Sequence, residues 1–231
     1  LLQAAEQGTE TIVVVAGEGW HRGVIGLASS RIAERLYRPA IVLSTENGTA
    51  HGSARSIGNF HILKALESCS ELFNQFGGHA AAAGMKLPTA NIDSLRRALC
   101  EYAESVLTEE SRTPVLHIDA RVSPESLSIS LVRELSRMEP FGAGNPKPVF
   151  ATKGLSLRFE PKVMKDRHLK LYLGERDGRR FEAVWWDGVE KGKEQTLAVG
   201  RNIEVACTLD VNSWQGTERL QLVIEDIRDD N

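Results

Sequence analysis

The segment from Thr11 to Leu43 constrains the fold of this 231-residue chain more than any other feature. Its first part, 11–16, is a β-branched run typical of a buried strand, and glycines end it. Residues 23–38 then repeat apolar side chains at helical spacing up to a proline, and a second apolar run, 40–43, follows. Strand, glycine turn, helix and strand make a βαβ signature. The first half is therefore predicted to be an α/β domain with some parallel strand pairing.

The remainder of the first half continues this pattern. A third strand is expected over 49–54 and a helix over 59–69. A second amphipathic helix has apolar positions from Ile92 to Val106. The sequence then turns polar and reaches a proline at 114, so we expect the first domain to cover residues 1–110.

A connecting segment, 111–148, is predicted to join this domain to the next. It contains a short apolar strand at 115–118, a helix over 126–138, and a loop rich in glycine and proline at 140–148. The lone Gly-x-Gly of that loop does not follow a strand and open a helix. We therefore interpret it as a loop and not as a phosphate site.

Residues 149–231 have an all-β pattern. The five predicted strands cover residues 149–159, 168–173, 180–186, 202–212 and 218–227. Gln215 and Gly216 predict a tight turn between the last two strands. Trp185 and Trp186 are consecutive in a strand, so one is expected in the core and the other partly exposed. Five strands with a long link between the third and fourth suit an OB-fold-like barrel that binds single-stranded nucleic acid, and they also suit a small sandwich.

The composition limits the classes of function. A formal net charge of -3 argues against affinity for nucleic acid over the whole surface, so such binding needs a local patch. Three widely spaced cysteines predict neither a structural zinc site nor a disulfide framework, and they favour a reducing, cytoplasmic location. No membrane span or signal peptide is recognisable. Because the chain starts without Met and soon enters a strand, we expect it to be a piece of a longer protein.

The segment Phe76–Gly84 contains two adjacent glycines, a histidine and a run of small side chains. Glycine lets a backbone approach a phosphate closely, and successive exposed N–H groups form an anion nest. A helix that began here would add its dipole. Gly77, Gly78 and His79 are therefore candidate phosphate ligands. The alternative is structural, because small side chains also allow a helix to pack tightly against a sheet.

Two further segments are candidate phosphate sites. Trp20, His21 and Arg22 follow the first strand, at the edge where α/β sheets bind ligands. The indole could stack on a base while the other two reach phosphate. The alternative places Trp20 in the core and pairs Arg22 with an acid.

The second of these segments contains Ser53, Arg55 and Ser56 next to a glycine. An arginine offers a bidentate fork to a phosphate, and serines offer short donors. A strand end followed by a helix cap would explain the same residues structurally.

A basic and aromatic cluster occupies the start of the β-rich part. Residues 153–180 include nine basic and four acidic residues, a local excess of +5. Such a mixture on neighbouring strands is typical of a groove that follows a single strand, although a solvated barrel surface is the plainer alternative. The candidate ligands of such a single strand are Arg158, Lys162, Lys165, Arg167, Lys170, Tyr172, Arg179 and Arg180. No metal-ligand spacing and no carboxylate pair stands out, so we expect no metal and no catalytic residue in this chain.

Together these segments resemble a known family. Residues 77–84 match GGHxxAAG, the signature of DHHA1 domains, and residues 19–26 and 52–56 match two further segments in the same order. Residues 141–146 resemble the entry into an OB domain. Along nearly its whole length the chain resembles the RecJ family, single-strand-specific 5′→3′ DNA exonucleases of the DHH phosphoesterase superfamily. Ala54 replaces a glycine found in many relatives, and little effect is expected from one methyl group.

The resemblance implies a carboxy-terminal, substrate-binding portion of an exonuclease of DNA repair and recombination. The family binds Mn²⁺ or Mg²⁺ in an amino-terminal DHH domain, so the metals would lie outside this chain. Ser53, Arg55, Gly78 and His79 would hold phosphates near the scissile bond or the 5′ end, with residues 20–22 along the same wall. The OB-like domain would hold the downstream strand. Single-strand-binding protein and a helicase are the implied protein partners, and no membrane partner is implied.

Two other functions remain open. A DHH-type phosphoesterase of short oligonucleotides or cyclic dinucleotides would share the glycine-rich signature, although small substrates do not need a long basic groove. A non-catalytic nucleic-acid-binding module would also combine phosphate ligands with no metal site.

Overall fold

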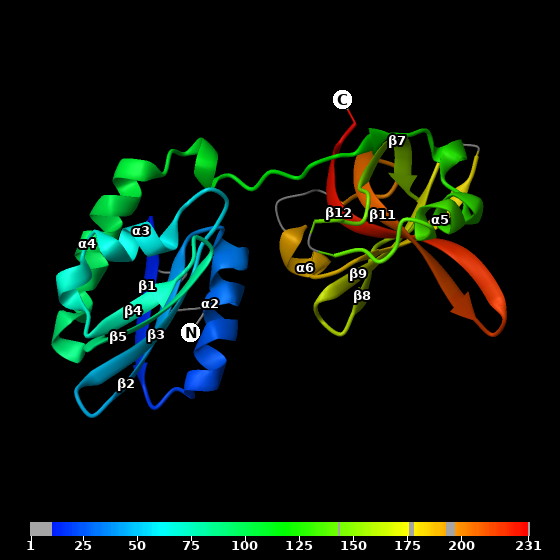
Figure 1. Ribbon diagram of the computed structural model, residues 1–231. Coiled ribbons are helices and arrows are strands. Elements are labelled where there is room, and N and C mark those ends of the chain that lie inside the picture. The colour runs from blue at the N-terminus through cyan, green and yellow to red at the C-terminus, as the bar shows by residue number, and fades with distance from the viewer. Residues whose placement is uncertain (1–10, 143, 176–177, 193–196, 231) are drawn as a thin grey trace. The chain divides into compact units, whose positions relative to one another are not determined.

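The computed structural model describes residues 11–142, 144–175, 178–192 and 197–230 (Figure 1). The chain divides into two compact units, and the boundary along the sequence falls between Val115 and Leu116. Each unit encloses apolar clusters of its own.

A five-stranded sheet in the order β1-β2-β3-β5-β4 forms the centre of the first unit. β1 (Val13–Glu18) runs parallel to β2 (Ala40–Glu46), which confirms the predicted parallel pairing. β3 (Thr49–Arg55), β5 (Ala82–Pro88) and β4 (Gln75–Gly78) follow in antiparallel pairs. β4 is thus an edge strand of this sheet.

Helices cover both faces of the sheet. α2 (Arg22–Leu36) lies on one face, and α3 (Ile62–Glu67) and α4 (Ile92–Val106) lie on the other (Figure 1). α3 is shorter than the predicted 59–69 because the Nδ1 atom of His61 accepts a hydrogen bond from the Lys64 N–H, 3.3 Å away, and caps the helix there. Short 3₁₀ turns complete the unit: η1 (Ser70–Leu72), η2 (Thr89–Asn91) and η3 (Glu110–Arg112).

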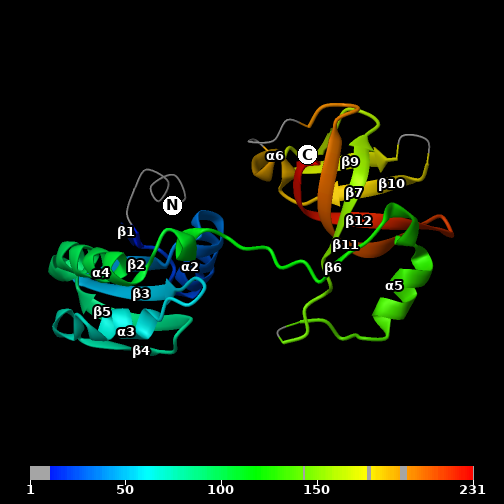
Figure 2. The same cartoon turned by 90° about the horizontal axis from the view of Figure 1, so that it is seen from above.

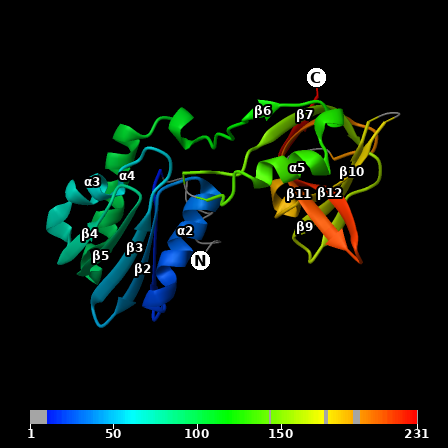
Figure 3. The same ribbon diagram turned by 45° about the vertical axis from the view of Figure 1, so that its right-hand side comes forward.

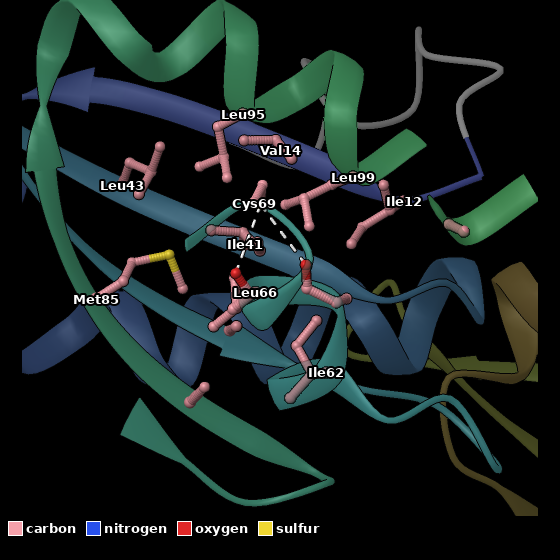
Figure 4. Packing of buried hydrophobic residues seen from close by; sticks show 14 of the residues in the cluster. Ile12, Val14, Ile41, Leu43, Ile62, Leu66, Cys69, Met85, Leu95 and Leu99 are labelled. Atoms are coloured by element: carbon pink, nitrogen blue, oxygen red, sulfur yellow. Dashed lines mark hydrogen bonds between the residues drawn. The ribbon is translucent and has the colours of Figure 1, made fainter. Parts of the chain in front are cut away.

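The central strands bury side chains on both faces, which explains their continuous apolar sequence. One set packs against α3 and α4 (Figure 4). This cluster joins Ile12, Val14, Ile41 and Leu43 of the sheet side to Ile62 and Leu66 of α3 and to Leu95 and Leu99 of α4. The alternate residues Val13, Val15 and Val42 pack against α2 through Ile25 and Ile32. Successive strand residues point to opposite faces, so one short run serves two cores.

The connection into the second unit differs from the prediction. Residues 114–118 form no strand, and the expected strand at 115–118 is wrong. The side chain of Val115 is 68% exposed, so its apolar character does not indicate a buried strand. Pairing begins only at β6 (Ala120–Arg121), which runs parallel to β7 (Phe150–Leu157). A strand needs a partner, and this segment finds one only where it reaches β7.

The second unit is a closed barrel. Its strands are β7, β8 (Lys162–Met164), β9 (His168–Gly174), β10 (Arg180–Trp185), β11 (Asn202–Trp214) and β12 (Thr217–Asp229). Pairing runs β7-β11-β12-β10-β9, and β9 pairs again with β7 through Ser156 and Gly174. A sandwich would leave the sheet open, so the OB-like barrel is confirmed.

Helices and turns around the barrel follow the prediction in part. α5 (Ile129–Ser136) lies beside the strands (Figure 2), after the 3₁₀ turn η4 (Pro124–Ser126). α6 (Gly188–Lys191) begins the link from β10 to β11. Gln215 and Gly216 both have positive φ, as the predicted tight turn requires. The β11–β12 hairpin extends beyond the barrel (Figure 3).

The two adjacent tryptophans differ in burial, as predicted. Trp185 is fully buried in the barrel core, whereas Trp186 is 51% exposed.

Candidate nucleic-acid interface

The segment between β1 and α2 has structural partners for each predicted site residue. The indole of Trp20 lies over Gly17, where a Cβ atom would be 2.2 Å from the ring. His21 caps α2, because its Nδ1 atom accepts a hydrogen bond from the Gly23 N–H at 3.1 Å. The Nη2 atom of Arg22 lies 3.0 Å from Oε2 of Glu46, and both side chains are more than half exposed. Of the three, His21 and Arg22 remain accessible to a ligand.

Ser53 and Arg55 lie next to one another on β3. The Nη1 atom of Arg55 donates to Oγ of Ser53 at 3.2 Å and to the Ala54 carbonyl at 2.8 Å. Gly26 of α2 passes close by, because a Cβ there would be 3.4 Å from the Ser53 Oγ and 3.5 Å from the Arg55 Nη2. The pair therefore points to the α2 side of the sheet. Ser56 acts differently, since its hydroxyl donates to the Phe60 carbonyl and holds the following turn.

The glycine-rich segment forms a hairpin between β4 and β5, so no helix begins there. The His79 N–H donates to the Ala82 carbonyl at 2.8 Å, which removes it from the predicted anion nest. At Gly78, with φ 153°, a Cβ would lie 2.3 Å from the Ala82 carbonyl oxygen. Gly77 has open space on its Cβ side, and the side chain of His79 is exposed. Gly78 therefore serves packing, whereas Gly77 and His79 are open to a ligand.

Strand register brings these segments together. Ser53 lies opposite Gly84, which lies opposite Gly77, and His51 lies opposite Lys86. A hollow of about 520 Å³ opens here. It is lined by His51, Gln75, Phe76, Gly77, Gly84, Met85 and Lys86.

The hollow has a floor of glycine backbone, and the cationic Lys86 lies on its rim. Its two glycines carry no side chain, so a ligand can approach the backbone. Burial lowers the pKa of His51, and the positive charges of Arg22 and Lys86 lower it further. Sequence reasoning missed Gln75, which lies two residues before Gly77 on β4. It also missed His51 and Lys86, because only the register of three strands brings them to the same hollow as Gly77.

Several predicted DNA ligands of the second unit are held by other groups. The guanidinium of Arg167 pairs with Asp187. The Nη1 atom of Arg179 donates to the carbonyls of Glu125 and Leu127, each at 3.0 Å, and so holds the segment before α5 against the barrel. Lys170 pairs with Glu182 at 2.8 Å. These three positive side chains thus have structural partners.

The other predicted ligands are more accessible. Lys162 and Lys165 are exposed around β8. Arg158, Tyr172 and Arg180 line a hollow of about 470 Å³ between the barrel and the segment that precedes α5. Phe159, 58% exposed, meets the Tyr172 ring edge-on at 5.8 Å between ring centroids. Arg219 of β12 completes this wall, and the sequence did not indicate it, because it lies far along the chain from the basic cluster.

The described residues contain no group of three or more His, Cys, Asp or Glu side chains that could hold a metal ion. Within the same residues no helix is long and apolar enough to cross a membrane.

Two family models match this chain, one in each of its two compact units. Residues 8–105 match the family described as the DHHA1 domain, and residues 118–226 match the one described as the RecJ OB domain. The class is thus a DHHA1-type α/β domain followed by an OB-type barrel.

Two curated proteins that are similar to this chain have the same name. The chain is 34% identical over 226 residues to the "Single-stranded-DNA-specific exonuclease RecJ" of Bacillus subtilis, covering 96% of this chain and 28% of that protein. It is 30% identical over 223 residues to the Escherichia coli protein of the same name, covering 90% and 36% respectively. The crystal structure of Thermus thermophilus RecJ in complex with Mn²⁺ superposes with a TM-score of 0.79 at 26% identity, over 100% of this chain and 33% of that one. A second structure of that protein contains Mg²⁺. This chain belongs to the RecJ family and spans about a third of the length of these relatives.

Proposed function

We propose that this chain is the carboxy-terminal, substrate-binding portion of a RecJ-type 5′→3′ exonuclease, and that it binds single-stranded DNA without cleaving it. The proposal depends on one observation, the joint presence of the half-buried Arg55–Ser53 pair in the DHHA1 domain and an arginine-lined hollow on the OB barrel. In the intact enzyme Mn²⁺ or Mg²⁺ would activate water for hydrolysis of the phosphodiester. We assign its ligands to a part of the protein outside these residues.

The first unit has the chemistry to hold phosphates. Arg55 offers a charged fork supported by Ser53, and charge-assisted hydrogen bonds to phosphate are among the strong ones. Lys86 and His51 add donors on the rim of the neighbouring glycine floor. A backbone without side chains at Gly77 and Gly84 allows a strand to come close. This surface would grip the DNA next to the catalytic metals.

The second unit would hold the strand further along. Arg158, Arg180 and Arg219 supply positive charge, and Phe159 and Tyr172 supply ring faces on which bases can stack. Because the net charge of the whole chain is -3, binding would come from these two patches alone. It should therefore weaken steeply with salt.

The first experiment measures binding and cleavage by the purified chain. Fluorescence anisotropy with a labelled single strand of about a dozen nucleotides should give an affinity whose logarithm falls linearly with the logarithm of salt concentration. Incubation with Mn²⁺ should leave the strand intact. Robust cleavage would contradict the proposed lack of activity, and absence of binding would contradict the proposed function.

Arg55→Ala tests the first patch. Loss of one charged contact should weaken binding about tenfold at low salt and reduce the salt slope by about 0.7. Arg97→Ala is the matched control, because Arg97 is an exposed arginine of α4, on the opposite face of the sheet, that also contacts a serine hydroxyl. Equal affinity of the two variants for single-stranded DNA would show that Arg55 and its neighbours are not part of the DNA interface.

A further inference from the structure

Two hollows on the barrel share Glu182 and Arg219. The first is the arginine-lined hollow described above. The second, about 490 Å³, is bounded by Lys170, Glu182, Asn212, Gln215, Thr217 and Arg219. Because both reach the same two side chains, the two hollows lie next to one another across β9, β10 and β12, and together we call them the Glu182 groove.

Glu182 joins two cations at the middle of this groove. Its Oε2 atom is 2.8 Å from the Lys170 Nζ, and its Oε1 atom is 3.2 Å from the Arg219 Nη1. The hydrogen bond with Lys170, together with the charges of Lys170 and Arg219, holds the pKa of Glu182 below its usual value. The same hydrogen bond raises the pKa of Lys170. Glu182 and Lys170 are thus charged at neutral pH, and they form an ion pair beside the Arg219 guanidinium.

The surroundings of this carboxylate are positive. Glu182 is the one carboxylate among the described residues that line either hollow. Arg158, Arg179 and Arg180 lie along the same groove. The side chain of Glu182 is 23% exposed, so it can be reached and displaced from solvent.

We propose that the Glu182 carboxylate occupies the place of a DNA backbone phosphate, and that a phosphodiester group exchanges with it between Lys170 and Arg219. A carboxylate and a phosphodiester are both anions with two oxygens that accept from ammonium and guanidinium groups. The inference depends on the proposed binding of single-stranded DNA by this barrel. Glu182 then lowers the affinity of the groove for single-stranded DNA, so that the DNA dissociates readily. Weak binding suits a DNA strand that must move through the enzyme during cleavage.

Glu182→Gln tests this exchange in the full 231-residue chain. The amide keeps the shape of the side chain but removes the competing charge. Affinity for a labelled oligothymidine of about a dozen nucleotides should rise about 3- to 10-fold at low salt. The salt slope should steepen by about 0.7 for each cation released, about 1.4 for both.

Glu134→Gln is the matched control. It makes the same change of charge and frees Arg137 from an ion pair of 2.9 Å on α5, but neither residue lines the groove. Its affinity should change less than about twofold. A rise in the control as large as that in Glu182→Gln would reduce the effect to net charge and overturn the proposal.

Lys170→Gln provides a second measurement. The proposal expects it to weaken binding more in the Glu182→Gln background than in the wild type, where the ammonium is already occupied. Equal losses in the two backgrounds, or unchanged affinity of Glu182→Gln beside a wild type that binds, would contradict the exchange and leave the proposed function standing. A wild-type chain that does not bind single-stranded DNA would overturn both the exchange at Glu182 and the proposed function.

Discussion

Adjacent residues of the glycine-rich hairpin have different roles, although their sequence looks uniform. Gly78 packs so closely on β5 that no side chain fits, whereas Gly77 faces open space beside the hollow. His79 has its N–H bonded within the hairpin and its imidazole exposed. One motif therefore combines a packing residue with residues that a ligand can reach.

Gly78→Ala should destabilise the first unit by about 2 to 4 kcal/mol. The new Cβ would lie 2.3 Å from a backbone oxygen and 2.5 Å from the Ala83 Cα, at a φ that side chains rarely adopt. Chemical denaturation measures this cost. Gly77→Ala is the control and should cost less than about 1 kcal/mol, because its Cβ meets nothing within 4 Å. A similar loss of unfolding free energy in both variants would show that the backbone around Gly78 can shift to accommodate a Cβ atom.

At the scale of elements, Glu204 of β11 ties the entry strand to the barrel. Its side chain is 4% exposed and pairs with Arg121 of β6 and Arg228 of β12, which are 60% and 64% exposed. Burial alone would raise the pKa of Glu204, but hydrogen bonds from Arg228 and Arg121 hold it below its usual value. The buried member of this cluster is thus the carboxylate, and the two arginines keep it charged.

Replacing both Arg121 and Arg228 by Ala should destabilise the second unit more than Glu204→Gln does. The double change leaves a buried charge without a partner, which costs about 3 to 5 kcal/mol, whereas Glu204→Gln removes that charge and should cost about 1 kcal/mol. Urea denaturation at neutral pH measures the difference. A larger cost for Glu204→Gln would contradict this account.

The pH dependence gives a second readout of the same cluster. The folded-state pKa of Glu204 lies below the unfolded value of about 4.3, so its contribution is full above that pH and is lost as the pH falls through the folded-state value. The wild-type advantage over Glu204→Gln should therefore shrink on acidification below about pH 4.

At the scale of the whole molecule, each unit has a complete core. The clusters of the first unit draw on its sheet and on α2, α3 and α4, and the cluster of the second draws on the barrel and α5. The chain passes between the units near Val115, where side chains are exposed. Separate cores indicate separate folding units.

A fragment of residues 116–231 should fold alone and unfold cooperatively, at a temperature within a few degrees of the second-unit transition in the full chain. It should keep salt-dependent binding of single-stranded DNA. Circular dichroism measures the thermal unfolding of the fragment, and fluorescence anisotropy measures its binding of single-stranded DNA. A fragment that starts at residue 129 is the control, because it lacks β6 and the fully buried Leu127 and should melt lower. A 116–231 fragment that stays unfolded would show that its core depends on the first unit.

The sequence predicted most of the fold because burial repeats locally along the chain. The continuous apolar runs of β1 and β2 and the helical spacing in α2 and α4 are properties of short windows. The prediction failed at 115–118, where an apolar run has no partner strand to bury it. The assignment of Lys170 and Arg167 as DNA ligands stays a prediction, and the sequence did not indicate that they pair with Glu182 and Asp187.

By itself the sequence determined the two kinds of domain, their order, the family, and the arginine and glycine segments of the candidate site. Only the tertiary structure decided which groups meet. Strand register brings Lys86, His51 and Gly77 to the lining of one hollow, and the pairing of β9, β10 and β12 places Glu182 between Lys170 and Arg219. The physical reason is that secondary structure follows local periods of burial, whereas charges pair across strands that the closed sheet brings together from distant parts of the chain.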